Sequence, residues 1–320
     1  MTSKYIPFIL IILLNGFTVP AGRIETAAAD IQSGSQQNNY TAGKSYFGRN
    51  KYIEYMPGNL PVVISVPHGG YETPDEIKDR VRGTDHHDKK TIEAVLEIKK
   101  HFYELTGKYP YIIINRLHRI KLDPNRDYDM AVQNDSLAGI AYTEFQNFIE
   151  LAEKDVEEKW GRGFYIDLHG HNHTSQLIEL GYLLESEILS FNDADLSDDL
   201  FVEKSSVRNL MKKSEFSFPE VIRGEVSFGG ILEKYGYGIV PGPSIKAPDT
   251  EFFFSGGYNT LVHGPTETNH FNSMQIELPT KGVRDSDENI VKVSRAITES
   301  ILEFMRIHYK LDLTKPGSSN

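Results

Sequence analysis

The sequence predicts an α/β fold, in which helices flank both faces of a mixed, mainly parallel sheet. Apolar runs of strand length alternate along the chain with segments whose apolar residues recur at helical spacing. Clusters of polar residues follow the apolar runs directly, as expected where ligands bind beyond the carboxyl ends of parallel strands. With 320 residues and a hydrophobic content of 39%, the chain is long enough to bury a sizeable core.

The predicted elements alternate in type from residue 60 onwards. Strands are predicted at LPVVISV (60–66), YPYIIIN (109–115), FYIDL (164–168), LIELGYLL (177–184) and SMQIELP (273–279). Helices are predicted from about residue 89, near 138–160, and from about 290 to 305 at the C-terminal end. A strand that alternates with a helix in this way favours a sheet with helices packed on both faces.

Residues 1–21 have the features of a secretory signal peptide. Lys4 precedes an apolar run, and small residues follow at Val19 and Ala21. The run is shorter than the ~20 apolar residues that a bilayer span needs. We therefore expect a secreted or periplasmic protein that leaves the membrane once the signal is cleaved, with a retained anchor as the alternative. Residues 22–56 are expected to be a polar linker or leader, 57–311 the folded domain and 312–320 a polar tail.

Composition excludes several classes of function. The chain has 34 basic and 45 acidic residues and a net charge of −11, which argues against nucleic acid as a partner. It has no cysteine, so neither a disulfide nor a thiol nucleophile is available. The chemistry must therefore come from carboxylates, imidazoles and a bound metal. The sequence leaves the oligomeric state open.

Histidines follow two of the predicted strands. His68 comes directly after the strand at 60–66, and His169 after the strand at 164–168. Two imidazoles and one carboxylate, with the fourth position open, form the ligand set of a catalytic zinc site. Asp85 and Glu72 are both candidates for the carboxylate. For Asp88 we favour a cap at the start of the following helix.

Five motifs occur in the order of a known family. PHGG (67–70), GTD (83–85), HRIKLDPNRD (118–127), IDLHGH (166–171) and QIELP (275–279) resemble the N-formylglutamate amidohydrolase-like family, over about residues 57–305. That family is similar to zinc carboxypeptidases and aspartoacylase. The resemblance implies a zinc-carboxypeptidase-like (phosphorylase/hydrolase-like) fold, with a mixed eight-stranded sheet and one zinc ion.

The resemblance also implies the metal ligands His68, Asp85 and His169. One position departs from the carboxypeptidase pattern, which has its carboxylate ligand three residues after the first histidine, where this chain has Tyr71. Glu72 therefore stays open as the third ligand. Asp167 is expected to orient a metal ligand by a hydrogen bond without binding the metal itself. His171 and His173 are expected to line the pocket or face solvent.

Roles for the other candidates follow from the resemblance and from their chemistry. Asn125 and Arg126 match an Asn-Arg pair that grips a substrate carboxylate, a task that suits a planar guanidinium. Arg119 is expected to steady a developing oxyanion, and Lys121 to contact the scissile carbonyl or a second carboxylate. Glu277 lies in an apolar strand, where a charge is costly unless it has a function.

The resemblance implies that Glu277 is the general base. Arg284 is expected as a further substrate contact or as an ion-pair partner of Glu277, and Tyr258 as a substrate contact through a mobile hydroxyl. Together these residues imply a zinc-dependent hydrolase of amide bonds, in which the metal activates water and the substrate is an N-acyl amino acid or a small peptide with a free carboxylate. The alternatives are a two-metal phosphoesterase built on Asp85-His86-His87, and a secreted binding protein without catalysis on the same fold.

Overall fold

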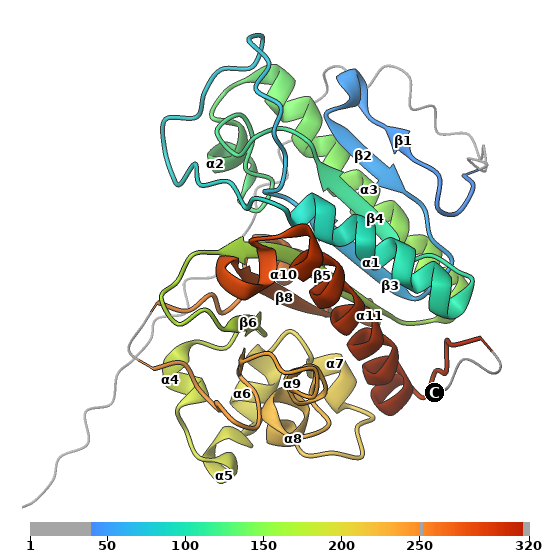
Figure 1. Cartoon of the computed structure of the whole chain (residues 1–320), viewed down its shortest axis with the longest axis vertical. Helices are drawn as coiled ribbons and strands as arrows, with labels where there is room; N and C mark the ends of the chain where they lie inside the picture. The colour runs from blue at the N-terminus through green and yellow to red at the C-terminus, as the bar shows by residue number, and fades with distance from the viewer. Residues whose placement is uncertain (1–39, 250–251, 316–320) are drawn as a thin grey trace, which may run out of the picture. The chain divides into compact units, whose positions relative to one another are not determined.

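The computed structural model describes residues 40–249 and 252–315, so the predicted signal peptide lies outside the described residues. In the described part of the chain, eight strands form one sheet in the order β1-β2-β4-β3-β5-β8-β6-β7 (Figure 1). The strands are β1 Tyr46–Phe47, β2 Ile53–Met56, β3 Val62–Val66, β4 Tyr111–Asn115, β5 Gly163–His171, β6 Ile178–Gly181, β7 Ile239–Val240 and β8 Phe271–Pro279.

The sheet is mixed, and its centre is parallel. β3 pairs in parallel with both β4 and β5, and β5 pairs in parallel with β8. β6 and β7 form a further parallel pair, whereas β1, β2 and β6 join their neighbours β2, β4 and β8 antiparallel. The predicted fold class, a mixed and mainly parallel sheet, is confirmed.

Long helices cover both faces of the sheet. α1 (Thr91–Thr106) and α11 (Asp287–Tyr309) pack beside each other, and α3 (Ser136–Trp160) lies across the sheet from them (Figure 1). The shorter helical elements are α2 Tyr128–Val132, α4 Ser186–Leu189, α5 Asp193–Leu196, α6 Asp199–Lys204, α7 Arg208–Met211, α8 Phe218–Arg223, α9 Phe228–Glu233, α10 Tyr258–Val262, η1 Arg49–Lys51 and η2 Thr280–Arg284. No helix within 40–249 or 252–315 combines the length and apolarity that a membrane crossing needs.

Alternate residues of β3 enter two different cores. Val62, Ile64 and Val66 belong to the cluster formed with α1 and α11. Val63 belongs to the cluster on the other face, with Phe145 of α3. Because both faces of β3 are buried, its sequence reads as a continuous apolar run and not as an alternating one. This explains why a plain apolar run was a sufficient signal for the central strands.

The predicted strands at 60–66, 109–115, 164–168, 177–184 and 273–279 correspond to β3, β4, β5, β6 and β8, and the predicted helices to α1, α3 and α11. The start of the domain is corrected. β2 pairs with β4, and Ile53 and Tyr55 are buried, so residues that we expected in the leader belong to the sheet. The predicted tail is also partly folded, because Leu313 is buried and the backbone N–H of Lys315 donates to the Leu105 carbonyl at 3.0 Å.

Candidate metal centre and active site

A cavity of about 800 Å³ brings together residues that lie in or after the carboxyl-terminal parts of four strands of the sheet. The predicted site residues that line it are His68, Arg119, Asn125, Arg126, His169 and Glu277. Because β3, β4, β5 and β8 form a continuous parallel block, their carboxyl ends meet at one edge. The cavity lies at that edge, where ligand sites of open α/β sheets are expected.

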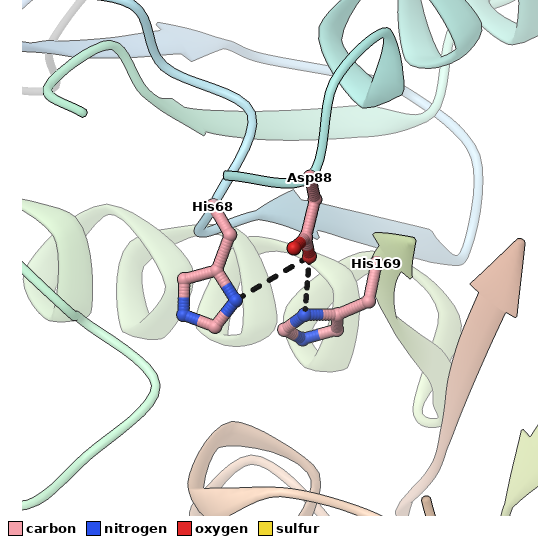
Figure 2. A group of neighbouring side chains, drawn as sticks. All are labelled: His68, Asp88 and His169. Atoms are coloured by element: carbon pink, nitrogen blue, oxygen red, sulfur yellow. Dashed lines mark hydrogen bonds and ion pairs between the residues drawn. The ribbon is translucent and has the colours of Figure 1, made fainter. Parts of the chain in front are cut away.

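His68, Asp88 and His169 converge in this cavity (Figure 2). The Asp88 carboxylate oxygen Oδ2 lies 3.5 Å from Nδ1 of His68 and 3.2 Å from Nδ1 of His169. Two ligand atoms that share a tetrahedral zinc ion, each 2.0–2.1 Å from it, are about 3.3 Å apart. All three side chains are buried. The spacing of these atoms therefore fits three ligands of one metal ion, and the cavity leaves a side open for a fourth.

A second carboxylate lies behind each histidine ring. Nε2 of His68 is 2.6 Å from Oδ1 of Asp123, and Nε2 of His169 is 2.8 Å from Oδ2 of Asp167. When Nε2–H donates to these carboxylates, the lone pair of Nδ1 on each ring faces Asp88. A carboxylate behind a histidine is the usual arrangement at metal sites, because it fixes the tautomer and orients the ring. Asp167 thus lies where the sequence led us to expect it, and Asp123 was not anticipated.

The charges of this group favour a cation. Burial alone would raise the pKa values of Asp88, Asp123 and Asp167, but their contacts outweigh it and lower all three. The lowering contacts are with His169 and His68 for Asp88 and Asp167, and with His68 and Arg119 for Asp123. Burial alone would lower the pKa of His169, but Asp167 raises it well above its ordinary value. Three buried carboxylates thus surround two imidazoles. A metal ion that binds here displaces any proton from the imidazole nitrogens that bind it.

Glu277 lies beside the three candidate ligands on the neighbouring strand. In the register of β5 and β8 it is paired with His169, and it is 4% exposed. Its Oε1 accepts a hydrogen bond from Gln275 at 2.9 Å, and its Oε2 has no hydrogen-bond partner among the residues described. Burial raises the pKa of Glu277 to about 8, reinforced by Asp88 and opposed by His169. A nearby cation would favour its ionised form, and in that form a carboxylate can accept a proton.

The arginines of the cavity have different environments. Nε and Nη2 of Arg119 both lie 2.9 Å from Oδ2 of Asp123, so one carboxylate links Arg119 to His68. The Arg126 side chain is 42% exposed, and its Nη1 donates to the Asn125 carbonyl at 3.0 Å. The Asn125 side chain accepts the backbone N–H of Asn259 at 2.8 Å and is therefore partly committed to the fold. Arg126 is the cation better placed to meet a ligand.

The structure does not bring Asp85, the carboxylate that the resemblance implied as a ligand, to the candidate ligand group. Its side chain is 64% exposed and lies 3.9 Å from that of His86, which is 92% exposed. Asp88 takes its place and is not a helix cap, because α1 begins only at Thr91, after a left-handed Lys90 with φ of 66°. The other candidate, Glu72, is exposed and bridges to the backbone of Leu117. Among the described residues, Asp85, His86 and His87 belong to neither group of possible metal ligands, so the structure offers no support for the two-metal phosphoesterase.

Three predicted substrate contacts lie elsewhere. Lys121 is buried outside the lining of the cavity, with Nζ 2.7 Å from both the Ile77 carbonyl and Asp79. Arg284 donates to the carbonyls of Leu278 and His171, at 2.8 and 2.9 Å, and so fastens η2 to β5. Tyr258 is also absent from the lining and hydrogen-bonds the side chain of Tyr142, at the start of α10. All three side chains form hydrogen bonds within the protein, to backbone carbonyls or to a neighbouring side chain. We therefore assign them a structural role.

A second group of possible ligands consists of His171, His173 and Glu179. Their ligand atoms are engaged in hydrogen bonds with one another and with the backbone. Nε2 of His171 donates to the Leu177 carbonyl at 2.9 Å, and its Nδ1 accepts the backbone N–H of His173 at 3.0 Å. Both ring nitrogens of His171 are therefore occupied. Nδ1 of His173 is 2.6 Å from Oε1 of Glu179. His171 and His173 both line the cavity, as expected, but the group with Asp88 is the better candidate for a metal.

No family model and no curated protein matches the sequence. Among solved structures, the chain is similar to N-formylglutamate amidohydrolase from Ralstonia eutropha, with 13% identity and a TM-score of 0.46 over 80% of this chain and 97% of that one. A gene product from Agrobacterium tumefaciens has 10% identity and a TM-score of 0.44, over 79% and 94% of the two chains. A provisionally assigned metallopeptidase from Shewanella amazonensis has 11% identity and a TM-score of 0.35, over 80% and 81%.

Replacing Asp167 with asparagine is expected to weaken metal binding by ~10–100-fold, because the amide cannot take the Nε2–H of His169 as a carboxylate does. The affinity would be measured by competition with a chelator of known strength. Asp287→Asn is the control, because its side chain is 95% exposed and should leave the affinity unchanged. A folded Asp167→Asn chain with wild-type affinity would show that His169 is not a ligand.

Proposed function

We propose that this chain is a zinc-dependent hydrolase of amide bonds in N-acyl amino acids or small peptides with a free carboxylate. One observation carries the proposal: His68, Asp88 and His169 present three atoms at the spacing of metal ligands, beside the buried Glu277. Two imidazoles and one carboxylate form a usual ligand set of hydrolytic zinc sites. The similarity of the motifs to amidohydrolases points to the same reaction class.

The residues divide the chemistry between them. A zinc ion held by His68, Asp88 and His169 would polarise the scissile carbonyl and make water more acidic. Glu277 takes a proton from the attacking water and returns it to the nitrogen of the leaving amine, so that the C–N bond breaks as the amine is protonated. Arg119, held in place by Asp123, presents positive charge to the oxygen that becomes negative.

The carboxylate of the substrate is assigned to Arg126. Its guanidinium lines the cavity and is partly exposed, so it can form two parallel hydrogen bonds with a carboxylate. This assignment places the free carboxylate on the leaving amino acid. We further propose export of the protein, to the periplasm or the outside, on the strength of the signal pattern in residues 1–21.

Removal of the metal tests the function directly. The full chain would be stripped with a chelator and assayed on a panel of N-acyl amino acids, before and after one equivalent of zinc. Release of the free amino acid should disappear on stripping and return with zinc. Equal turnover before and after stripping would contradict the metal-dependent mechanism. A zinc-loaded chain that hydrolyses none of the panel would favour the non-catalytic binding protein.

Arg126→Lys is expected to lower kcat/KM for free-acid substrates by roughly tenfold, because the charge remains but the two-pronged contact is lost. Amidated versions of the same substrates should show little difference between wild type and variant. The measurement is kcat/KM on matched acid and amide pairs. An equal loss on both members of a pair would mean that Arg126 does not hold the carboxylate.

A further inference from the structure

One side of the cavity is aromatic, and the mechanism above makes no use of it. His173, Phe252 and Phe254 line the cavity together, and we call them the aromatic wall. The rings of His173 and Phe254 are stacked, with centroids 4.8 Å apart and an interplanar angle of 16°. Phe252 meets both rings edge-on, at 5.7 and 5.0 Å. Phe252 is nevertheless 70% exposed, which leaves a large apolar surface facing water.

The aromatic wall is held in a fixed arrangement by Glu179 of β6. This carboxylate is 2% exposed, and its Oε1 lies 2.6 Å from Nδ1 of His173. Its Oε2 accepts the backbone N–H of Phe254 at 2.9 Å. The next turn of the segment is fastened as well, since the N–H of Leu183 donates to the Ser255 carbonyl at 2.6 Å. Because the buried Glu179 binds both His173 and the backbone of Phe254, these two rings keep a defined position in the cavity.

The order of the strands places the wall across the site from the cations. Arg119 and Arg126 follow β4, and Glu179 lies in β6. Between β4 and β6 the sheet order is β3, β5 and β8, the strands associated with His68, His169 and Glu277. A substrate whose carboxylate contacts Arg126 and whose amide lies beside the candidate metal ligands therefore extends its other half toward the aromatic wall.

We propose that the aromatic wall binds the acyl half of the amide substrate and selects an aromatic or flat apolar acyl group. The inference rests on the proposed function for the direction of the substrate. A formyl or acetyl group is too small to cover Phe252, whereas a phenyl ring can pack against it and remove apolar surface from water. Acidic acyl groups are disfavoured, because Glu179 and Glu277 place two further carboxyl groups on this side.

The test compares two substrates that share one leaving amino acid, N-phenylacetyl-alanine and N-acetyl-alanine, on the zinc-loaded full chain. Burial of a phenyl ring is expected to raise kcat/KM about 10- to 100-fold for the phenylacetyl compound. In Phe252→Ala this preference should fall most of the way to 1, and Phe252→Tyr should keep it. Phe191→Ala is the matched control, an exposed phenylalanine stacked on Phe201 outside the cavity lining, and should leave the preference unchanged.

A binding measurement separates this inference from the proposed function. Phenylacetate and acetate, the acyl products, would be titrated calorimetrically into the zinc-loaded wild type and Phe252→Ala. Phenylacetate should bind wild type at least tenfold more tightly than acetate does, and the variant should lose that advantage. This result would support the wall even if no amide were hydrolysed, an outcome that would overturn the proposed function alone. No binding of phenylacetate, or equal binding to both chains, would overturn the aromatic subsite.

Discussion

Replacing Glu277 with glutamine is expected to lower kcat by ~10²–10⁴-fold, the usual value of general-base assistance. Glutamine keeps the shape of the side chain but cannot accept a proton at neutral pH. Because Glu277 lies beside the candidate ligands and not among the three convergent atoms, the metal content should stay that of wild type. The measurements are kcat, metal per chain and thermal unfolding on one preparation of protein.

Glu54→Gln provides the matched control for this experiment. Glu54 is also a buried glutamate in a strand of the same sheet, β2. Its carboxylate forms an ion pair with Arg116, and neither residue lines the cavity. Its neutralisation should affect thermal unfolding more than kcat, because it weakens a partly buried ion pair without touching the site. If Glu277→Gln lost its metal or failed to fold while Glu54→Gln behaved as expected, Glu277 would be a ligand or a structural acid, and the base would be another residue.

Asp88→Asn is expected to abolish tight metal binding, and hydrolysis with it. The loss of a charged ligand should exceed the ~10–100-fold that loss of an outer hydrogen-bond partner costs. The asparagine oxygen can still accept the backbone N–H of Gly170, which is 3.1 Å from Asp88, so the loop should keep its course. The measurement is elemental analysis of the purified chain, together with a chelator competition.

Asp85→Asn is the matched control for Asp88→Asn. Asp85 is three residues away in the same segment. The resemblance implied it as a metal ligand, yet its side chain is exposed. Its variant should keep both metal and activity. Loss of metal in Asp85→Asn but not in Asp88→Asn would reverse the assignment and restore the original prediction from the sequence.

The central strands and the long helices could be predicted because burial on both faces leaves an unambiguous apolar run, as in β3. The start of the domain could not, because β1 and β2 are short and lie among polar residues. The small helices between β6 and β7, such as α4 and α5, span only four residues each. A periodic pattern cannot be recognised over one turn, so these helices were not predicted.

The histidines of the site were predictable because each follows an apolar strand, whereas the carboxylate was not. Asp85 and Asp88 have the same chemistry, but in the fold Asp88 contacts His68 and His169, whereas the Asp85 side chain is 64% exposed. The cations raise a similar difficulty. Lys121 and Arg284 are used by backbone carbonyls, a role that no sequence pattern distinguishes from substrate binding. Such choices are settled by tertiary contacts.

Anomalous diffraction at the zinc edge, from crystals of the wild-type chain grown with zinc, would show whether His68, Asp88 and His169 hold a metal ion. We expect one strong peak, about 2.0–2.2 Å from Nδ1 of His68, Nδ1 of His169 and an oxygen of Asp88. Glu277 should lie nearby without reaching the ion. A peak between His171, His173 and Glu179, or no peak at His68 at saturating zinc, would contradict the metal centre and the hydrolase built on it.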